Sequence, residues 1–188
     1  DNYLAPIVLI PQSPGEDRST PKAFLIQTKS ICYDQSFYGY GGGSHPDSKI
    51  YLSLLYLIVH SKLFRYWCLV RSSRIGASWR TFIKEDLDSF PFPDPQLLSV
   101  EQRTQIQELA ATLSVGMPQD WRPLDDFIDR LFGLTDSEAE VISDTVAFRS
   151  PYRVSRVLAE QPPELREVNA FCCRLQDLLQ PLFTLTGQ

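Results

Sequence analysis

The chain has 188 residues, of which 43% are hydrophobic and 22% are charged. These values exclude a largely disordered chain, and the length allows one good-sized domain with an appendage but not two full-size domains. Four cysteines without regular spacing do not form a disulfide framework, so a reduced, cytoplasmic setting is expected. The chain opens at Asp1 without an initiator methionine, and we therefore expect it to be part of a longer protein.

The formal net charge of −5 is distributed unevenly along the chain. Residues 1–84 contain ten Lys and Arg against five Asp and Glu, whereas residues 85–188 contain eight Arg against eighteen acids. From Ser48 to Lys84 there is no acid, although seven basic residues occur. Such an asymmetry between the two halves points to a negatively charged partner for the basic half, such as nucleic acid.

The first half of the chain is predicted to be rich in β structure. Short apolar runs predict strands at 7–10 and 23–27, and two further short extended pieces are predicted at 31–33 and 37–40. A glycine-rich loop follows at 41–46. Its three glycines lack the following Lys-Ser/Thr of a phosphate-binding loop, so we interpret them as a plain flexible connection.

A long apolar segment from Ser48 to Phe64 predicts a helix that is apolar on most sides and is therefore buried. Ser48 is a candidate N-cap for this helix. The charged residues within and just after the segment argue against a membrane span. Beyond it, residues 66–70 and 80–83 predict strands on either side of a polar stretch.

The proline-rich segment 91–95 interrupts the chain, because no helix continues through it, and it coincides with the change in charge. Helices are predicted beyond this point. Ser99 with Gln102 and Thr135 with Glu138 form two capping-box patterns, each followed by an amphipathic pattern.

Two more amphipathic stretches complete the helical half. An apolar stripe from Leu124 to Phe132 stops at Gly133, a typical residue at a helix end. A last helix is predicted to begin at Leu165 and to end before Pro181.

The predicted fold class is therefore α+β, with a mixed or antiparallel sheet around a buried helix followed by a helical subdomain. Residues 1–95 are expected to form the β-rich part, and residues 96–188 the helical part.

Patterns typical of catalysis are scarce. The two histidines, His45 and His60, are far apart and have no cysteine at ligand spacing, which argues against a zinc site. The best enzymatic candidate is a metal-dependent nuclease in which Asp34 and Asp47 hold Mg²⁺ and Lys49 polarises the attacking water. Because Asp-x-Lys triplets are common by chance, and helix dipoles favour acids at helix starts, we assign no catalytic or metal-binding residue.

The stretch 71–84 combines the residue types that bind nucleic acid. Cations and small hydroxyl donors contact phosphates, arginine reads base edges in a groove, and aromatic rings stack on bases or wedge between them. With three residues from earlier segments, the candidate DNA-binding residues are Arg71, Ser72, Ser73, Arg74, Ser78, Trp79, Arg80, Lys84, Lys49, Tyr38 and Tyr40. The alternative is a solvated hairpin tip with Trp79 in the core, or a basic half that pairs with the acidic half.

Several segments resemble the target recognition domain of adenine-N6 DNA methyltransferases, of the Taq-type and fused restriction–modification (type IIG) kinds. The likeness follows residues 54–66, then Ser72-Ser73 with Gly76, and then 82–93, in the order of the family. In that family the helix leads into a strand, a serine-rich loop follows, and a proline-containing exit leads into helices. Phe24, Asp34, Phe37 and Tyr38-Gly39 are similar to an earlier strand of the family and the loop after it. Residues 124–142, with 131–135 at their centre, are similar to a helix pair that trails such domains, so the resemblance covers about residues 6–147.

The resemblance implies a module that recognises a short sequence in double-stranded DNA. It presents an adenine to an upstream methyltransferase domain of the same chain, which flips the base out and methylates it with S-adenosylmethionine. The present sequence has no Asn/Asp-Pro-Pro-Tyr/Phe motif and no glycine-rich cofactor loop, so neither cofactor binding nor catalysis is expected within it. The alternatives are a protein-interaction or assembly module that uses the acidic helical half, and the nuclease.

Overall fold

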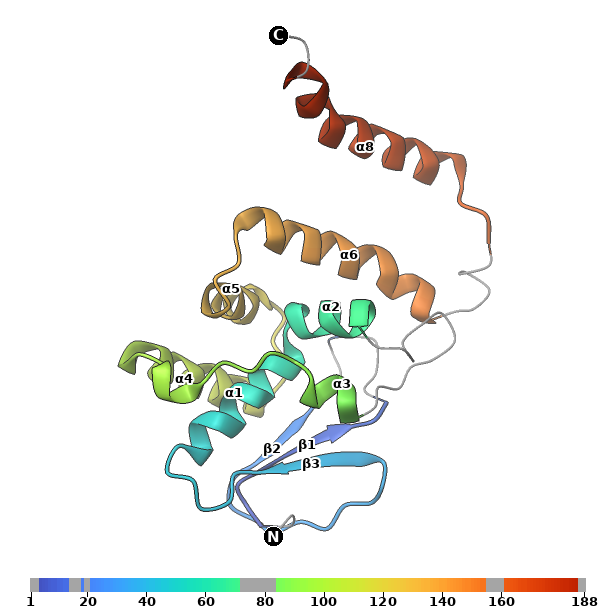
Figure 1. Ribbon diagram of the computed structural model, residues 1–188. Helices are drawn as coiled ribbons and strands as arrows, with labels where there is room; N and C mark the ends of the chain where they lie inside the picture. Colours follow the sequence, from blue (N-terminus) through green and yellow to red (C-terminus); the bar gives the residue numbers. More distant parts are fainter. Residues whose placement is uncertain (1–3, 14–17, 19–20, 72–83, 155–160, 186–188) are drawn as a thin grey trace. The chain divides into compact units, whose positions relative to one another are not determined.

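The structure is a computed structural model that describes residues 4–13, 18, 21–71, 84–154 and 161–185. The chain divides into two compact units, Asp1–Arg156 and Val157–Gln188, and each is considered by itself. The first unit contains a three-stranded antiparallel sheet and most of the helices, which confirms the predicted α+β class (Figure 1).

The sheet has the strand order β2–β1–β3, with β1 (Ile7–Pro11) in the centre, β2 (Phe24–Ile26) and β3 (Phe37–Gly41). Both neighbours run antiparallel to β1, and its first four residues are buried. The predicted strands at 7–10 and 23–27 are confirmed within a residue or two, and the extended piece predicted at 37–40 is strand β3. The predicted extended piece at 31–33 forms no strand in the described chain.

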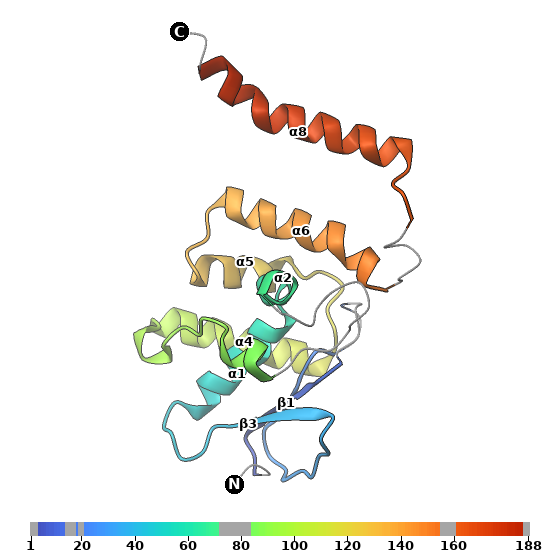
Figure 2. The same cartoon turned by 45° about the vertical axis from the view of Figure 1, so that its right-hand side comes forward.

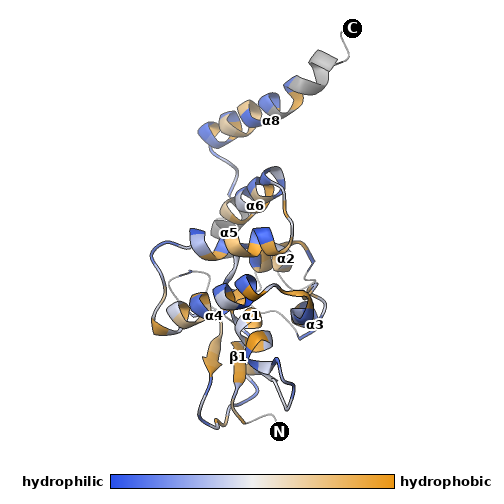
Figure 3. Ribbon diagram, turned by 90° about the vertical axis from the view of Figure 1, so that its left-hand side faces the viewer, coloured by the Kyte–Doolittle hydropathy of each residue, from blue (hydrophilic) through white to orange (hydrophobic). Residues whose placement is uncertain are grey.

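The predicted buried helix is α1 (Ser48–His60), which packs against the sheet and against α4 (Val100–Val115). Figure 3 shows the strongly apolar character of β1, on which this helix packs. The N-cap of α1 is Asp47 and not Ser48, and it makes no side-chain cap hydrogen bond. The carboxylate of Asp47 instead accepts a hydrogen bond from Arg103.

The prediction of one helix through Phe64 followed by a strand at 66–70 is wrong. The backbone is extended at Ser61, and a second helix, α2 (Lys62–Arg71), begins directly after it. The Ser61 hydroxyl oxygen accepts a hydrogen bond from the Phe64 amide at 3.1 Å, as an N-cap residue does. Aromatic and β-branched residues favour strands only weakly, and here Phe64, Cys68 and Leu69 share the buried face of a helix.

The chain resumes as α3 (Lys84–Asp88) and a short 3₁₀ helix, η1 (Pro95–Leu97). The predicted strand at 80–83 lies outside the described residues. Phe90, just after α3, makes edge-to-face contacts with Phe64, Trp67 and Phe132, with ring centroids 5.4–5.6 Å apart. This aromatic cluster ties the segment after α3 to α2 and to the residue that follows α5.

The later helices of the first unit are α4, α5 (Arg122–Leu131) and α6 (Asp136–Val154), seen from a second side in Figure 2. Both predicted capping boxes are present, at Ser99–Gln102 and Thr135–Glu138. Gly133, with a positive φ of 68°, follows the end of α5 as predicted.

The three strands lie before the predicted boundary at residue 95, and the elements after it are helical. By packing, α4 contacts α1 and α6 contacts α2. The helices on the two sides of this boundary therefore share one compact unit.

The second unit holds α8 (Leu165–Leu185). The helix continues through Pro181, so the prediction that it ends earlier is wrong; a proline removes one backbone hydrogen bond, but its φ is compatible with a helix. Among the side chains of α8 that the structure describes, the large apolar ones of Leu165, Val168, Phe171 and Leu175 are exposed. Over the described residues, every helix is too short or too polar to cross a bilayer.

Candidate nucleic-acid interface

The structure describes five of the eleven predicted DNA-binding residues. Tyr38 and Tyr40 lie on β3, Lys49 in the first turn of α1, Arg71 at the end of α2 and Lys84 at the start of α3. The other six lie in segment 72–83, outside the described residues, and they are Ser72, Ser73, Arg74, Ser78, Trp79 and Arg80.

Two of the described residues meet through a third that the sequence did not indicate. Lys84 forms an ion pair with Asp88 on the same helix, and the Tyr40 hydroxyl donates a hydrogen bond to the other Asp88 oxygen at 2.9 Å. The Lys84 ammonium also lies 5.4 Å from the centroid of the Tyr40 ring. We call this set, formed by Tyr40, Lys84 and Asp88, the β3–α3 contact.

The protonation states in the β3–α3 contact follow from its geometry. Burial raises the pKa of Asp88, but hydrogen bonds from Lys84 and Tyr40 outweigh this and hold the pKa below its ordinary value. Burial, followed by the hydrogen bond to Asp88, raises the pKa of Tyr40 well above its ordinary value. At neutral pH Asp88 is therefore a carboxylate and Tyr40 a neutral phenol.

Arg71 and Lys84, which flank segment 72–83, are both tied to the same part of the fold. The Arg71 guanidinium lies 5.1 Å from the centroid of the Trp67 ring, and the Arg71 residue is exposed. The Trp67 indole N–H donates a hydrogen bond to the carbonyl of Asp86 in α3 at 3.3 Å. The chain therefore leaves α2 and returns at α3 beside one aromatic ring.

The other two described candidates are placed differently. Tyr38 is partly buried and packs against the hydrophobic core. Lys49 lines a hollow between β2, α1 and α4, together with Leu25 and Gln107. The residues around this hollow do not include Arg71 or Lys84, so the structure does not join Lys49 to the β3–α3 contact.

The two carboxylates of the nuclease alternative have other partners. Asp47 forms an ion pair with Arg103 at 2.7 Å, and the hydrogen bond from Arg103 lowers the pKa of Asp47. Asp34 accepts the backbone N–H of Ser36 at 2.8 Å, which closes the turn before β3. Among the residues that the structure describes, no group of three His, Cys, Asp or Glu is placed to hold a metal ion.

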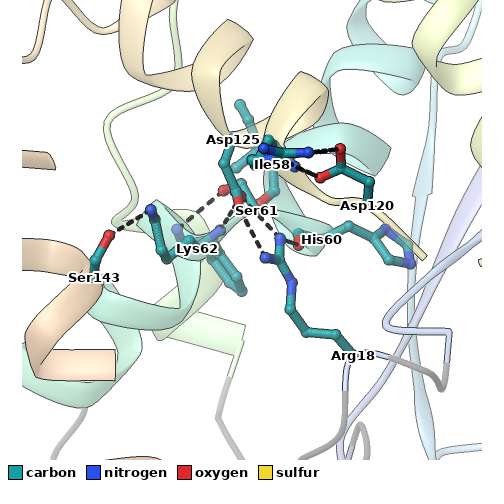
Figure 4. Close-up of polar contacts among 10 residues, drawn as sticks. Arg18, Ile58, His60, Ser61, Lys62, Asp120, Asp125 and Ser143 are labelled. Carbon is teal, nitrogen blue, oxygen red and sulfur yellow. Dashed lines mark hydrogen bonds and ion pairs between the residues drawn. The ribbon is translucent and has the colours of Figure 1, made fainter. Parts of the chain in front are cut away.

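The direction of α2 is fixed by a polar cluster at the break between α1 and α2 (Figure 4). Arg18 donates two hydrogen bonds to the Asp125 carboxylate, at 2.7 and 2.8 Å, and a third to the carbonyl of His60 at 2.9 Å. The same carboxylate accepts the backbone N–H of Lys62 at 2.9 Å, in the first turn of α2. Together with Trp121, whose ring lies 4.2 Å from the Arg18 guanidinium carbon, these residues form the junction cluster.

His60 is held in the neutral form within the junction cluster. The backbone N–H of Lys22 donates to Nε2 at 3.0 Å, so the ring proton is on Nδ1, which lies 2.8 Å from the carbonyl of Tyr56. The ring stacks on Trp121 at a centroid distance of 6.3 Å. Burial, with the positive charges of Lys22 and Arg18, lowers the pKa of His60 to about 4.

Sequence reasoning missed the junction cluster because its members are remote along the chain. Arg18 and Asp125 are 107 positions apart, and no local pattern links them. The Lys84–Asp88 pair, by contrast, has the i,i+4 spacing of a helical ion pair and could be found from sequence once a helix is assumed.

Comparison with protein-family models, curated proteins and solved structures finds no match for this chain. The likeness to target recognition domains therefore rests on short sequence segments. Residues 54–66 lie in α1 and α2, and residues 84–93 in α3 and the segment after it. The helical conformation of residues 66–70 departs from the helix-to-strand order of the family.

Loss of the junction ion pair should destabilise the first unit. The Asp125 side chain is 9% exposed, so Asp125→Ala leaves the Arg18 guanidinium and the Lys62 amide without their acceptor. We expect the free energy of unfolding to fall by about 2–4 kcal/mol, measured by urea denaturation. The control Asp120→Ala breaks an exposed, solvent-screened pair with Arg122 and should lower the free energy of unfolding much less than Asp125→Ala does. Equal losses in the two variants would show that the junction cluster has no special role.

Acid should weaken the fold through His60. The folded-state pKa of about 4 lies below the ordinary value of 6.5, so the unfolded chain binds the proton first as the pH falls. Stability should therefore be complete above pH 6.5 and decline towards pH 4, by up to about 3 kcal/mol from this residue. Urea denaturation of the wild type and His60→Gln at several pH values measures this. Parallel pH profiles for the two proteins would contradict a neutral His60.

Proposed function

We propose that this chain is a DNA-binding module that recognises a short sequence in double-stranded DNA, as the target recognition part of an adenine-N6 DNA methyltransferase. The observation that carries the proposal is the acid-free basic stretch from Ser48 to Lys84, together with the way its last part is anchored. Arg71 and Lys84 flank a segment with two further arginines, and both flanks are tied to one part of the fold through Trp67 and Asp86.

The charge pattern suits a phosphate backbone. Duplex DNA has about one negative charge per 1.7 Å of its axis, so a protein gains affinity by placing several cations along one surface. Segment 72–83 contains Arg74 and Arg80 and no acidic residue. The exposed Arg71, which directly precedes the segment, adds a third arginine. In the proposal these arginines contact phosphates or base edges, while Lys84 and Lys49 contact phosphates.

The remaining candidates supply positioning and stacking in the proposal. Ser72, Ser73 and Ser78 donate hydrogen bonds to phosphates. Trp79 stacks on bases or wedges between them. Tyr38 and Tyr40 are half-buried, so only the exposed part of each ring is able to contact a base. Recognition therefore depends mainly on segment 72–83 and its two flanking cations.

Methyl transfer itself belongs, in the proposal, to an upstream domain that binds S-adenosylmethionine in the cytoplasm of a prokaryotic cell. The present chain contributes target recognition for a methylation or restriction–modification system. It holds the duplex so that the target adenine reaches the catalytic domain, which must flip the base out of the stack to act on it.

A second candidate is a protein-interaction or assembly module, and α8 favours it. Leu165 and Phe171 are 75% and 63% exposed, and a single amphipathic helix does not bury such a face by itself. This role is compatible with DNA binding by the first unit, because it uses a different part of the chain.

The proposal predicts salt-sensitive binding that depends on the arginines of the basic stretch. We expect the full chain to bind a short random-sequence duplex, with log K falling steeply against log salt. Replacing Arg71, Arg74 and Arg80 together by alanine should weaken binding at least about tenfold and reduce the magnitude of the slope by about two to three. Fluorescence anisotropy over a range of salt concentrations measures both quantities.

The matched control replaces Arg122, Arg130 and Arg166 by alanine, which changes the net charge equally at exposed positions of the acidic half. This control should bind within about twofold of the wild type. Equal weakening in the two triple variants would indicate a general charge effect, and an unmeasurable affinity of the wild type at low salt would overturn the proposal. Enrichment of one sequence from a random duplex library distinguishes specific recognition from phosphate binding alone.

A further inference from the structure

We propose that Asp88 restrains DNA binding by occupying Lys84 in the free protein, and that a DNA phosphate displaces the Asp88 carboxylate from Lys84 on binding. The inference rests on the proposed function and assigns to Asp88 the role of a built-in competitor for the phosphate. Asp88 accepts from both other members of the β3–α3 contact: Lys84 bonds to one of its oxygens and the Tyr40 hydroxyl to the other.

The Lys84–Asp88 pair is poorly arranged to stabilise α3. Lys84 is the first residue of this five-residue helix and Asp88 the last, so each charge stands at the end that the helix dipole disfavours. The two side chains are 55% and 46% exposed, and exposed ion pairs contribute little to folding. The fold therefore does not require the pair, and solvent-borne anions have access to it.

Exchange of the two anions leaves every charged group with a partner. When a phosphate oxygen takes the Lys84 ammonium, the Asp88 carboxylate keeps the hydrogen bond from Tyr40 at 2.9 Å. Tyr40 lies on β3, so it holds Asp88 towards the sheet while Lys84 turns to the ligand. The exchange needs a rotamer change of one exposed side chain and no movement of the backbone.

The position of the pair fits a competitor for phosphate. Lys84 is the last cation of the acid-free stretch, and Asp88 lies just beyond the end of that stretch. Two other acids of α3, Glu85 and Asp86, lie closer in sequence, but Glu85 is exposed and outside the β3–α3 contact, and Asp86 is buried. The restraint on Lys84 is therefore assigned to Asp88 and not to the acidity of α3 in general.

The test is the affinity of the full-length Asp88→Asn variant for a short random-sequence duplex. The amide keeps the size of the side chain and an acceptor for Tyr40, so urea denaturation should show an unchanged midpoint. Release of Lys84 should tighten binding about three- to tenfold at low salt and steepen the slope of log K against log salt by about one.

Two matched variants separate a specific contact from a change in net charge. Glu85→Gln removes one negative charge from the same helix, and Asp120→Asn removes one from an exposed pair elsewhere. Both should stay within about twofold of the wild type. In a Lys84→Ala background, Asp88→Asn should give no gain, because the residue it releases is absent.

The outcomes distinguish this inference from the proposed function. Absence of binding by both the wild type and Asp88→Asn overturns the DNA-binding function itself. Binding by the wild type with an equal gain for Asp88→Asn and Glu85→Gln, or a gain that persists without Lys84, overturns the role of Asp88 and leaves DNA binding standing.

Discussion

The ion pair between Arg18 and Asp125 fixes the place where the chain breaks between α1 and α2, and the rest of the first unit depends on that break. One carboxylate satisfies the guanidinium and the first backbone N–H of α2, while the same guanidinium binds the last carbonyl of α1. Helix ends leave such groups without partners, so a break in a buried helix costs free energy unless side chains fill the positions. Arg18 and Asp125 supply them from distant parts of the chain.

The break determines which surface the basic residues occupy. With the break, α2 packs on α6 and α5, and Lys62 donates a hydrogen bond to Ser143 of α6 at 2.6 Å. The far end of α2 contacts α3 through Trp67, so Arg71 and the helix that begins at Lys84 lie beside the same ring. A structural ion pair in the interior thus positions the proposed interface.

Local sequence signals predicted much of the fold. Both capping boxes, the glycine after α5 and the three strands depend on residues within a few positions of one another, and these predictions were confirmed. The strand predicted at 66–70 failed although the segment is rich in aromatic and apolar residues, because its buried residues, Cys68 and Leu69, continue the helical face that begins at Phe64. Two contacts favour the helix over the strand: the N-cap hydrogen bond at Ser61 and the hydrogen bond from Lys62 to the distant Asp125 carboxylate. Both lie outside residues 66–70, so the pattern of that segment does not reveal them.

The sequence predicted the cations of the candidate interface, but it did not predict which side chains these cations contact. The absence of acids from Ser48 to Lys84 identified Arg71 and Lys84 directly from the sequence. Lys84 is paired because α3 places Asp88 one helical turn away. Asp88 also accepts a hydrogen bond from Tyr40, because the sheet packs beside α3. Contacts between segments more than forty residues apart leave no trace in composition or spacing.

Amide hydrogen exchange of the full chain, with and without a short duplex, shows whether the surface around α3 and the end of α2 contacts DNA. We expect slower exchange in the bound state at β3 and between Arg71 and Asp88, with little change in α4 and α5. Slower exchange confined to α8 or to the acidic helices, with none between Arg71 and Asp88, would contradict it.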